Sequence, residues 1–154
     1  MSGGLFGALD ISASGMTAER MRMDVIASNL ANANTTRGPN GGPYQRREVV
    51  LRSTGGSGVT AGQGFSAFGD FASALGAAGG GVEVAQIATD STPGRTVYDP
   101  GNPDANAQGY VTLPNVNSVT EMTDLITATR AYEANTTAIQ AVKGEAQHAL
   151  DVLR

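Results

Sequence analysis

A glutamate and a histidine near the end of the chain, Glu145 and His148, have the spacing of metal ligands on a helix. At this spacing a carboxylate and an imidazole share one helix face, which is half of a di-iron site in a helical bundle. A complete site needs a second pair, and the 154-residue chain has 1 His. Because this one His has no recognisable nucleophile paired with it, the sequence also shows no catalytic triad. We therefore interpret the pair as a solvated helix face and predict no metal site and no enzymatic activity.

A glycine pattern that could hold a phosphate lies at residues 56–61, GSGVTA, after an apolar strand. Dinucleotide-binding loops have this spacing, and a helix opens directly after them so that its N-terminus meets the pyrophosphate. Here residues 62–64 read Gly-Gln-Gly, and no strand–helix–strand repeat follows. We expect a loop at this position, with neither a cofactor nor a small-molecule substrate.

The basic cluster of the chain consists of Arg37, Arg46, Arg47 and Arg52. Such a cluster can bind nucleic acid or anionic lipid, or it can meet an acidic surface on a neighbouring subunit. The formal net charge is −4, the isoelectric point is near 4.8, and aromatic residues make up 5% of the chain. These values favour contact with a subunit and argue against nucleic acid as a partner. Cys is absent, which excludes disulfides and thiolate metal sites.

The start of the chain lacks the pattern of a secretory signal peptide. No basic segment precedes the apolar residues 5–13, and Gly7 and Asp10 interrupt them. No apolar run reaches the roughly 20 residues that a transmembrane helix needs. We therefore expect a protein that stays in the cytosol or leaves by a route that reads no cleaved signal.

The elements that would position any site are two long helices, one near each end, marked by apolar residues seven positions apart. Heptad spacing is typical of helices that pair in coiled coils, because such a stripe cannot face water alone. The residues assigned to this seam are Leu9, Met16, Met23, Leu30, Leu125, Tyr132, Ile139, Ala146, Leu150 and Leu153. We predict helices over residues 5–33 and 118–154 that pair as an antiparallel coiled coil within one chain.

A second apolar flank lies beside the seam on both helices. Its members are Ala18, Met21, Val25, Ile126 and Val142. A seam of two helices buries little, so we expect this flank to stay exposed in a free subunit. It should then become buried only against other subunits.

Polar residues mark where the helices begin and end. Ser118 and Glu121 have the spacing of a capping box, in which each side chain accepts from the backbone amide of the other. The asparagines assigned to the turn after the first helix and to the seam are Asn29, Asn32, Asn34 and Asn135. Their amides can cap the last carbonyls and bond to a neighbouring subunit, which would fix the helix register. The alternative is that they only terminate the helix.

Between the helices the residues predict a small β-rich part. Apolar alternation and turn signals indicate strands near 44–51, 82–87, 96–98 and 110–113. Residues 53–80 form a Gly-rich insertion, which we expect to touch a neighbour through Phe65, Phe68 and Phe71. The fold class is therefore mainly α with a small β part. The predicted domains are the helix 1–36, the β-rich middle 37–117 and the helix 118–154.

Several motifs, in a fixed order, carry a resemblance to a known family. They are SGMTAER at 14–20, MDVIASNLANANTT at 23–36, GGPYQRR at 41–47, GYV at 109–111, PNVN at 114–117 and RAYEAN at 130–135. Together they resemble the rod and hook axial proteins of the bacterial flagellum, and within that family the proximal-rod members. The turn at 98–106 matches too, with Asn102 where His is expected, and the Gly-rich stretch is not covered.

The resemblance implies a structural subunit of the flagellar basal-body rod, in the periplasm, exported by the flagellar type III apparatus without a cleaved signal peptide. It implies that its partners are other rod subunits and further copies of itself. It also allows, as a further partner, the hook–basal-body protein at the junction between export gate and MS ring. The residues alone leave one alternative open, a secreted fibrous or adhesive protein built on the same coiled coil.

Overall fold

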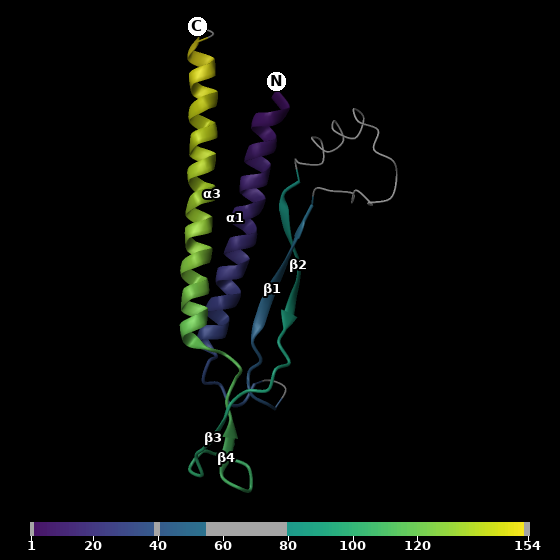
Figure 1. The fold of residues 1–154 in the computed structure, drawn as a ribbon, viewed down its shortest axis with the longest axis vertical. Helices are drawn as coiled ribbons and strands as arrows, with labels where there is room; N and C mark the ends of the chain where they lie inside the picture. The colour runs from purple at the N-terminus through teal and green to yellow at the C-terminus, as the bar shows by residue number, and fades with distance from the viewer. Residues whose placement is uncertain (1, 39–40, 55–79, 153–154) are drawn as a thin grey trace, which may run out of the picture. The chain divides into compact units, whose positions relative to one another are not determined.

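The computed structural model describes residues 2–38, 41–54 and 80–152. Two long helices begin and end the chain, and two small sheets lie between them in sequence (Figure 1). The elements are α1 (Ser2–Ala31), β1 (Arg47–Ser53), β2 (Val82–Thr89), β3 (Thr96–Tyr98), β4 (Tyr110–Thr112) and α3 (Ser118–Val152). The prediction of a mainly helical fold with a small β part is confirmed.

The end of α1 is closed by its own polar residues. The amide of Asn32 donates to the backbone oxygen of Ser28 at 2.9 Å, and the hydroxyl of Thr35 donates to Oδ1 of Asn32 at 3.2 Å. Ser28 O also accepts from the backbone amide of Asn32 at 3.1 Å, so both amide groups of Asn32 are bonded at the last turn of the helix. The sequence Asn-Ala-Asn after the helix therefore ends it close to the predicted boundary.

The start of α3 corrects the predicted capping box. Oδ1 of Asn117 accepts from the backbone amides of Val119 and Thr120, at 3.0 and 3.4 Å. Asn117 is thus the N-cap, one residue before Ser118, because an Asn side chain reaches the first free amides as well as a Ser does. The Glu121 carboxylate is free to point elsewhere.

The strands form two separate pairs, β1 with β2 and β3 with β4. At one end of the first pair Thr54 N donates to Gly81 O at 2.8 Å, and at the other Asp90 N donates to Arg46 O at 2.8 Å, so the strands run antiparallel. β1 begins later than predicted because the amide of Tyr44 bonds to Thr35 O and leaves the ladder.

In the second pair β3 and β4 are antiparallel, with Val97 opposite Val111 and Tyr98 opposite Tyr110. The two tyrosine rings meet edge to face at 5.3 Å. Gly109 has φ of +80°, and a Cβ there would lie 2.9 Å from the Tyr98 ring. The turn before β4 therefore needs glycine for its backbone and for the ring.

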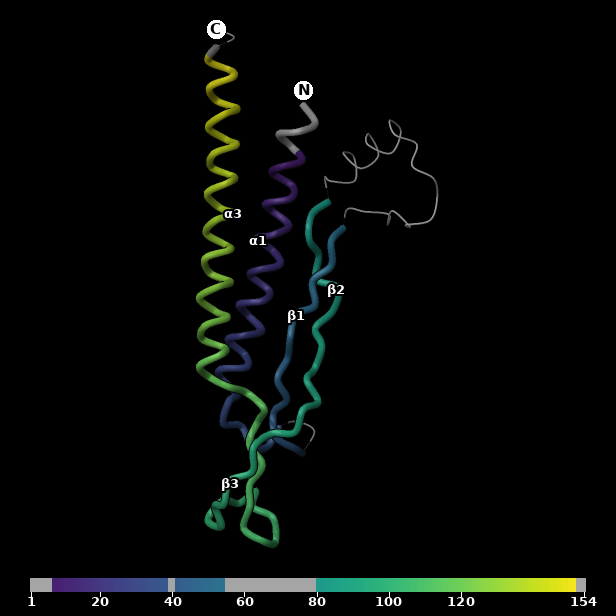
Figure 2. Tube along the Cα trace, viewed as in Figure 1, coloured from purple at the N-terminus to yellow at the C-terminus, as the bar shows by residue number. Residues whose placement is uncertain are grey.

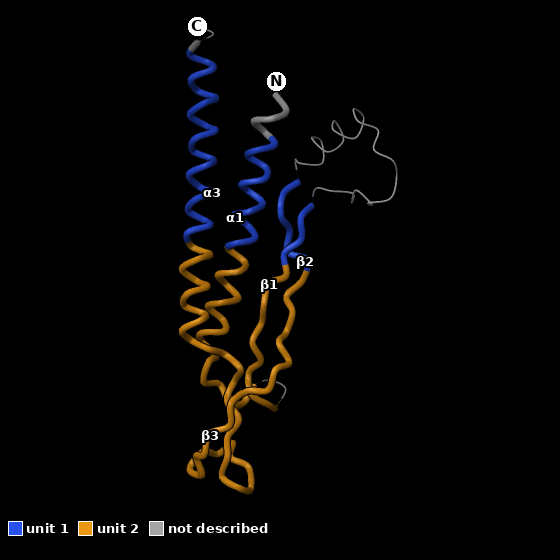
Figure 3. The backbone as a smooth tube through the Cα atoms, viewed as in Figure 1, with its two compact units in different colours: residues 1–19, 51–85, 130–154 blue, residues 20–50, 86–129 orange. Residues whose placement is uncertain are grey.

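The chain divides into two compact units, each assembled from segments far apart in sequence (Figures 2 and 3). The first unit contains Met1–Glu19, Leu51–Ala85 and Arg130–Arg154, and the second contains Arg20–Val50 and Gln86–Thr129. Each unit is described by itself below.

The buried apolar side chains lie mostly in the second unit. Among the described residues they are Val25, Ile26, Ala33, Val111 and Ala128 there, and Ala18 in the first unit.

The second apolar flank behaves differently from the prediction. Ala18 and Val25 are 2% and 8% exposed in the single chain, although we expected them to stay in water. Strands contact this side of α1 in each unit. In the first unit Val82 N of β2 donates to Ser14 Oγ at 3.0 Å, and in the second Nδ2 of Asn29 donates to Arg47 O of β1 at 2.8 Å. Met21 and Ile126 are 39% and 55% exposed, as predicted.

No helix in the described part of the chain combines the length and the apolar character that crossing a membrane requires.

Candidate functional site

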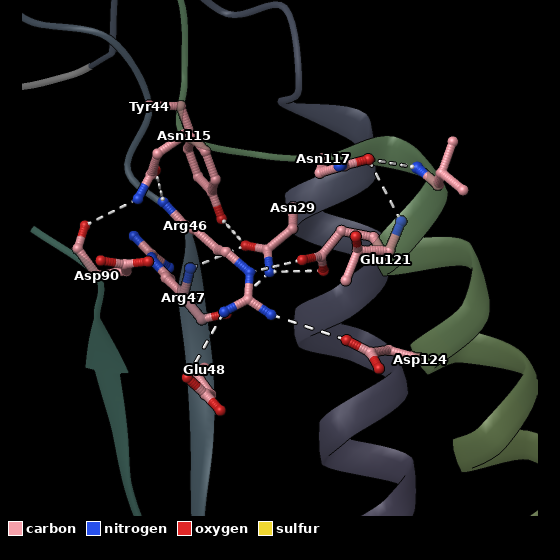
Figure 4. Close-up of polar contacts among 12 residues, drawn as sticks. Asn29, Tyr44, Arg46, Arg47, Glu48, Asp90, Asn115, Asn117, Glu121 and Asp124 are labelled. Carbon is pink, nitrogen blue, oxygen red and sulfur yellow. Dashed lines mark hydrogen bonds and ion pairs between the residues drawn. The ribbon is translucent and has the colours of Figure 1, made fainter. Parts of the chain in front are cut away.

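Two polar side chains are buried more completely than any large apolar residue in the described chain. Asn29, near the end of α1, is 0% exposed, and Glu121, in the first turn of α3, is 1% exposed. Both belong to the second unit. Nδ2 of Asn29 donates to Oε2 of Glu121 at 3.0 Å, which joins the two helices directly (Figure 4).

Asn29 also holds the first residue of β1. Its Nδ2 donates to Arg47 O at 2.8 Å, and its Oδ1 accepts from Arg47 N at 3.0 Å. The hydroxyl of Tyr44 donates to the same Oδ1 at 2.9 Å. The side-chain amide thus imitates a neighbouring strand, and its donors and acceptor are all used inside the chain. We name Asn29, Arg46 and Glu121 the polar cluster.

Arg46 supplies the positive charge of the polar cluster. Its Nε donates to Oε1 of Glu121 at 2.6 Å, and its guanidinium lies 3.5 Å from Glu48 and 3.8 Å from Asp124. The hydrogen bond to Glu121 is the largest cause that raises the pKa of Arg46 above its ordinary value, against the opposing effect of burial. A charge-assisted bond of this kind is stronger than a neutral one.

Asn115 and Asp90 attach the cluster to the end of β2. Oδ1 of Asn115 accepts from Arg46 N at 2.9 Å, and its Nδ2 donates to Asp90 O at 3.3 Å. The carboxylate of Asp90 accepts from the hydroxyl and the amide of Thr92, at 2.6 and 2.9 Å. These bonds, the hydroxyl first, lower the pKa of Asp90 below its usual value.

The arrangement can fix segments in place but offers no group for a reaction. The Glu121 carboxylate lies between a guanidinium and an amide, so it is neither a free base nor an open ligand. Within the described residues no group of three or more potential metal ligands occurs. A buried polar network is satisfied in one geometry only and costs free energy in others. The polar cluster therefore selects one fit of α1, β1 and α3.

The predicted seam residues take several positions. In the first unit Sδ of Met16 lies 3.4 Å from Oγ1 of Thr136, and in the second Sδ of Met23 lies 3.6 Å from Oγ1 of Thr129. Those in intermediate burial are Leu9, Met16, Met23, Leu30, Leu125, Ile139 and Ala146. Tyr132 and Leu150 are 36% and 67% exposed, and Leu153 lies outside the described residues. The coiled-coil packing stays a prediction.

The four predicted asparagines separate into different environments. The expectation that Asn29 bonds to a neighbouring subunit is wrong, because its buried side-chain amide donates to β1 and to Glu121 of its own chain. Asn32 caps α1, and Asn34 is exposed. Asn135 lies against Gly15 in the first unit, where a Cβ on the glycine would be 2.9 Å from its Nδ2.

The arginines do not act as one basic patch. Arg37 and Arg52 pair with Asp104 and Glu83, and Arg46 belongs to the polar cluster. The guanidinium of Arg47 lies 5.9 Å from the centre of the Tyr44 ring. The expectation of an acidic partner surface was wrong for Arg46, since its carboxylate partners come from its own chain. The insertion contacts Phe65, Phe68 and Phe71 lie outside the described residues.

Sequence reasoning missed Glu121, Arg46 and Asn115 as members of one site. One signal could have found part of it. Asn29 follows Ala18 and Val25 in the helical spacing of a buried face, and Glu121 precedes Leu125 and Ala128 in the same way. A polar residue in phase with an apolar stripe indicates a buried partner.

Two family models and several curated relatives match this chain. The model described as flagella basal body rod protein matches residues 9–39, and the model described as flagellar basal body rod FlgEFG protein C-terminal matches 107–152. The flagellar basal-body rod protein FlgC of Bacillus subtilis is 48% identical over 96% of this chain and 97% of its own length. The FlgC proteins of Borreliella burgdorferi and Escherichia coli O157:H7 are 41% and 40% identical, over 98% and 90% of this chain and 99% and 90% of their own lengths.

The chain belongs to the FlgC family of flagellar basal-body rod proteins. It is a structural subunit of the basal-body rod of the bacterial flagellum. Membership also decides against the secreted fibrous or adhesive alternative. The polar cluster falls partly inside both matched regions, since Asn29 lies in 9–39 and Glu121 lies in 107–152.

Proposed function

We propose that this FlgC-family chain forms part of the proximal rod, the segment of the drive shaft that crosses the periplasm and transmits rotation for motility. The observation that carries the proposal is the match of rod proteins along nearly the whole chain, 98% of it for one relative. The described residues support a structural role without catalysis, because their most buried polar groups are fully engaged with one another.

The polar cluster presents the helices to their neighbours in this proposal. Asn29 and Glu121 fix α1, β1 and α3 in the second unit, so the outer faces of both helices there keep a constant spacing. The seam residues then pack on one another within the chain, while exposed members such as Leu150 are covered on assembly. The proposed domains are two helices that assemble with neighbouring subunits, at 1–36 and 118–154, and the β-rich middle at 37–117.

The proposed partners are other rod subunits and further copies of this chain. The junction protein between export gate and MS ring is a further partner at the base. The flagellar type III apparatus delivers the chain to the periplasm without cleavage of a signal peptide. The insertion contributes a contact to a neighbour through Phe65, Phe68 and Phe71.

Deletion of the gene in its own bacterium tests the proposed function. We expect cells without completed rods, hooks or swimming, and full recovery when the unsubstituted gene is returned. The protein should be found in isolated basal bodies, and it should remain in the cytoplasm when flagellar export is disabled. Motile cells with complete basal bodies after the deletion would show that the chain is not a rod subunit.

The register role of the asparagines has its own test. In this proposal Asn32→Ala with Asn34→Ala permits export but blocks incorporation into the rod, measured by the amount of protein in isolated basal bodies. Asn34→Ala alone is the matched control, since Asn34 is exposed while Asn32 caps α1. Normal assembly of the double variant would mean that both residues only end the helix.

A further inference from the structure

Methionine sulfur is the atom of this chain that a mild oxidant attacks first. The sequence has 0 Cys, 0 Trp and 5 Met. A thiolate would react ahead of a thioether, and none is present. A two-electron oxidant such as hydrogen peroxide therefore oxidises methionine in preference to the other side chains. Met16, Met21, Met23 and Met122 lie in the described part of the chain, and Met1 lies outside it.

The thioethers of the second unit differ in how far they are open to water. Met122, near the start of α3, is 54% exposed, and Met21, on α1, is 39% exposed. Met23 lies two residues after Met21 on the same helix, so it points to a different side of α1. It is half-buried, and its Sδ lies 3.6 Å from Oγ1 of Thr129 on α3. Peroxide can thus approach Met122 from solvent, whereas α3 occupies one side of the Met23 sulfur.

The surroundings of Met122 can accept a sulfoxide. Oxidation adds one polar oxygen to the thioether, and such an atom is costly where the sulfur is packed but not where it faces water. The neighbours Val119 and Ile126 on α3 are 74% and 55% exposed, so the new oxygen keeps its hydration. Glu121 precedes Met122 in sequence but is 1% exposed, so the polar cluster lies on a different side of α3.

We infer that Met122 is a reversible oxidation site, which reacts with peroxide while the packed sulfur of Met23 is spared. A lone pair of the Met122 sulfur attacks one oxygen of hydrogen peroxide, so that the S–O bond forms as the O–O bond breaks. The thioether gives up two electrons, and the departing hydroxide takes the proton of the transferred OH group and leaves as water. In the reverse direction a methionine sulfoxide reductase restores the thioether, two thiols become a disulfide, and the oxygen leaves as water.

The order of reactivity separates a harmless oxidation from a damaging one. A sulfoxide at Met122 leaves the polar cluster and the contact of Met23 with Thr129 intact. A sulfoxide at Met23 places a polar oxygen between α1 and α3, where it disturbs the packing of flexible apolar side chains. The second unit therefore passes through an oxidised state that is still folded.

Peroxide treatment of the full purified chain tests this site. The sulfoxide at each methionine is quantified over time by mass spectrometry of fragments, and a urea denaturation curve is measured at each time. We expect Met122 to react first, Met21 next, and Met23 at least about tenfold more slowly than Met122, in the order of their exposure. The urea midpoint should stay constant while Met23 is unoxidised and fall as Met23 reacts.

Met122→Leu is the matched control, because leucine fills a similar volume and has no sulfur. This variant should lose the fastest reaction and keep both the urea midpoint and the rate at Met23. In urea-unfolded chain Met122 and Met23 should react at similar rates, which would assign their difference to the fold. A methionine sulfoxide reductase with dithiothreitol should reduce Met122 in the folded chain.

Three results would overturn the inference. Met23 could react as fast as Met122 in the folded chain, which would mean that the contact with α3 does not shield its sulfur. The urea midpoint could fall with the sulfoxide at Met122 alone, which would mean that this side chain is packed in solution. The reductase could leave Met122 sulfoxide unchanged in the folded chain, which would make the oxidation irreversible there.

Discussion

Both units hold a contact between a methionine of α1 and a threonine of α3. In the second unit α1 and α3 are also joined through polar side chains that water does not reach, and the described residues of the first unit show no such buried polar pair. Asn29 and Glu121 are 0% and 1% exposed and bond directly to each other. Met16 and Thr136 touch through sulfur and hydroxyl at 3.4 Å, and Ala18 is the buried apolar residue among the described side chains of that unit.

This difference separates two ways of holding helices together. A charged and hydrogen-bonded cluster admits one alignment, because any shift leaves buried polar groups without partners. Contacts between small and flexible apolar side chains admit neighbouring alignments at little cost. We therefore expect the second unit to be ordered in the free chain, and the first unit to gain most of its order from neighbours in the rod.

Removal of Glu121 should cause the largest loss of stability and so remove most of the difference between the two units. Glu121→Ala removes the carboxylate that accepts from Nε of Arg46 and from one of the two N–H groups of the Asn29 side chain. Breaking a buried ion pair costs about 3–5 kcal/mol. We expect a loss near the lower end, about 3 kcal/mol of unfolding free energy, because the Arg46 side chain is 23% exposed. Urea denaturation followed by circular dichroism measures it.

Glu48→Ala is the matched control for that experiment. Glu48 also pairs with Arg46, at 3.5 Å, but its side chain is 67% exposed. An exposed pair contributes at most about 1 kcal/mol, and we expect less than about 0.5 kcal/mol here. Equal losses for the two variants would mean that burial of the polar cluster does not stabilise the second unit.

The polar cluster also shows where sequence reasoning stops. Local signals predicted β3 at 96–98 and the end of α1 because turn residues and Asn-rich caps act over a few positions. The bond from Asn29 to Glu121 spans 92 positions, and no local pattern encodes its partner. Ser118 looked like the N-cap because Asn117 and Ser118 are both good caps, and the sequence alone does not decide between them. In the structure the amides of Val119 and Thr120 donate to Asn117.

Hydrogen exchange should sharpen the comparison along each helix. In purified monomer we expect the amides of α1 and α3 that belong to the second unit to exchange about 100-fold more slowly than those of the first unit. Local opening of the second unit must break the polar cluster, whereas local opening of the first unit breaks no such cluster. Exchange read by mass spectrometry on fragments of α3 before and after Arg130 gives the ratio directly. Uniform, strong protection from Ser118 to Val152 would contradict the expectation that the first unit is poorly ordered in the free chain.

A smaller effect is expected where β2 meets α1 in the first unit. A Cβ on Gly81 would collide with Oγ of Ser14 and lie 3.0 Å from its Cβ, and that Oγ accepts from Val82 N. Gly81→Ala should therefore destabilise by about 2 kcal/mol, as overpacked sites do.

The double variant Gly81→Ala with Ser14→Ala measures how much of that loss comes from this one contact. Removal of the hydroxyl relieves the collision, so the second substitution should recover part of the loss in urea denaturation. Strictly additive losses would show that Gly81 and Ser14 do not touch in solution.

The smallest expected effect comes from the two glycines inside the helices, which differ in their surroundings. Nothing lies within 4 Å of a Cβ added to Gly144, whereas one added to Gly15 lies 2.9 Å from Nδ2 of Asn135. Ala in place of Gly in a helix contributes about 1 kcal/mol, so Gly144→Ala should gain most of this amount. Gly15→Ala should gain close to nothing, because the methyl group displaces the Asn135 amide. In an Asn135→Ala background the full gain should return. Equal gains for both glycines in the natural background would mean that α1 and α3 do not stay this close in the free first unit, which would make the contrast with the second unit larger still.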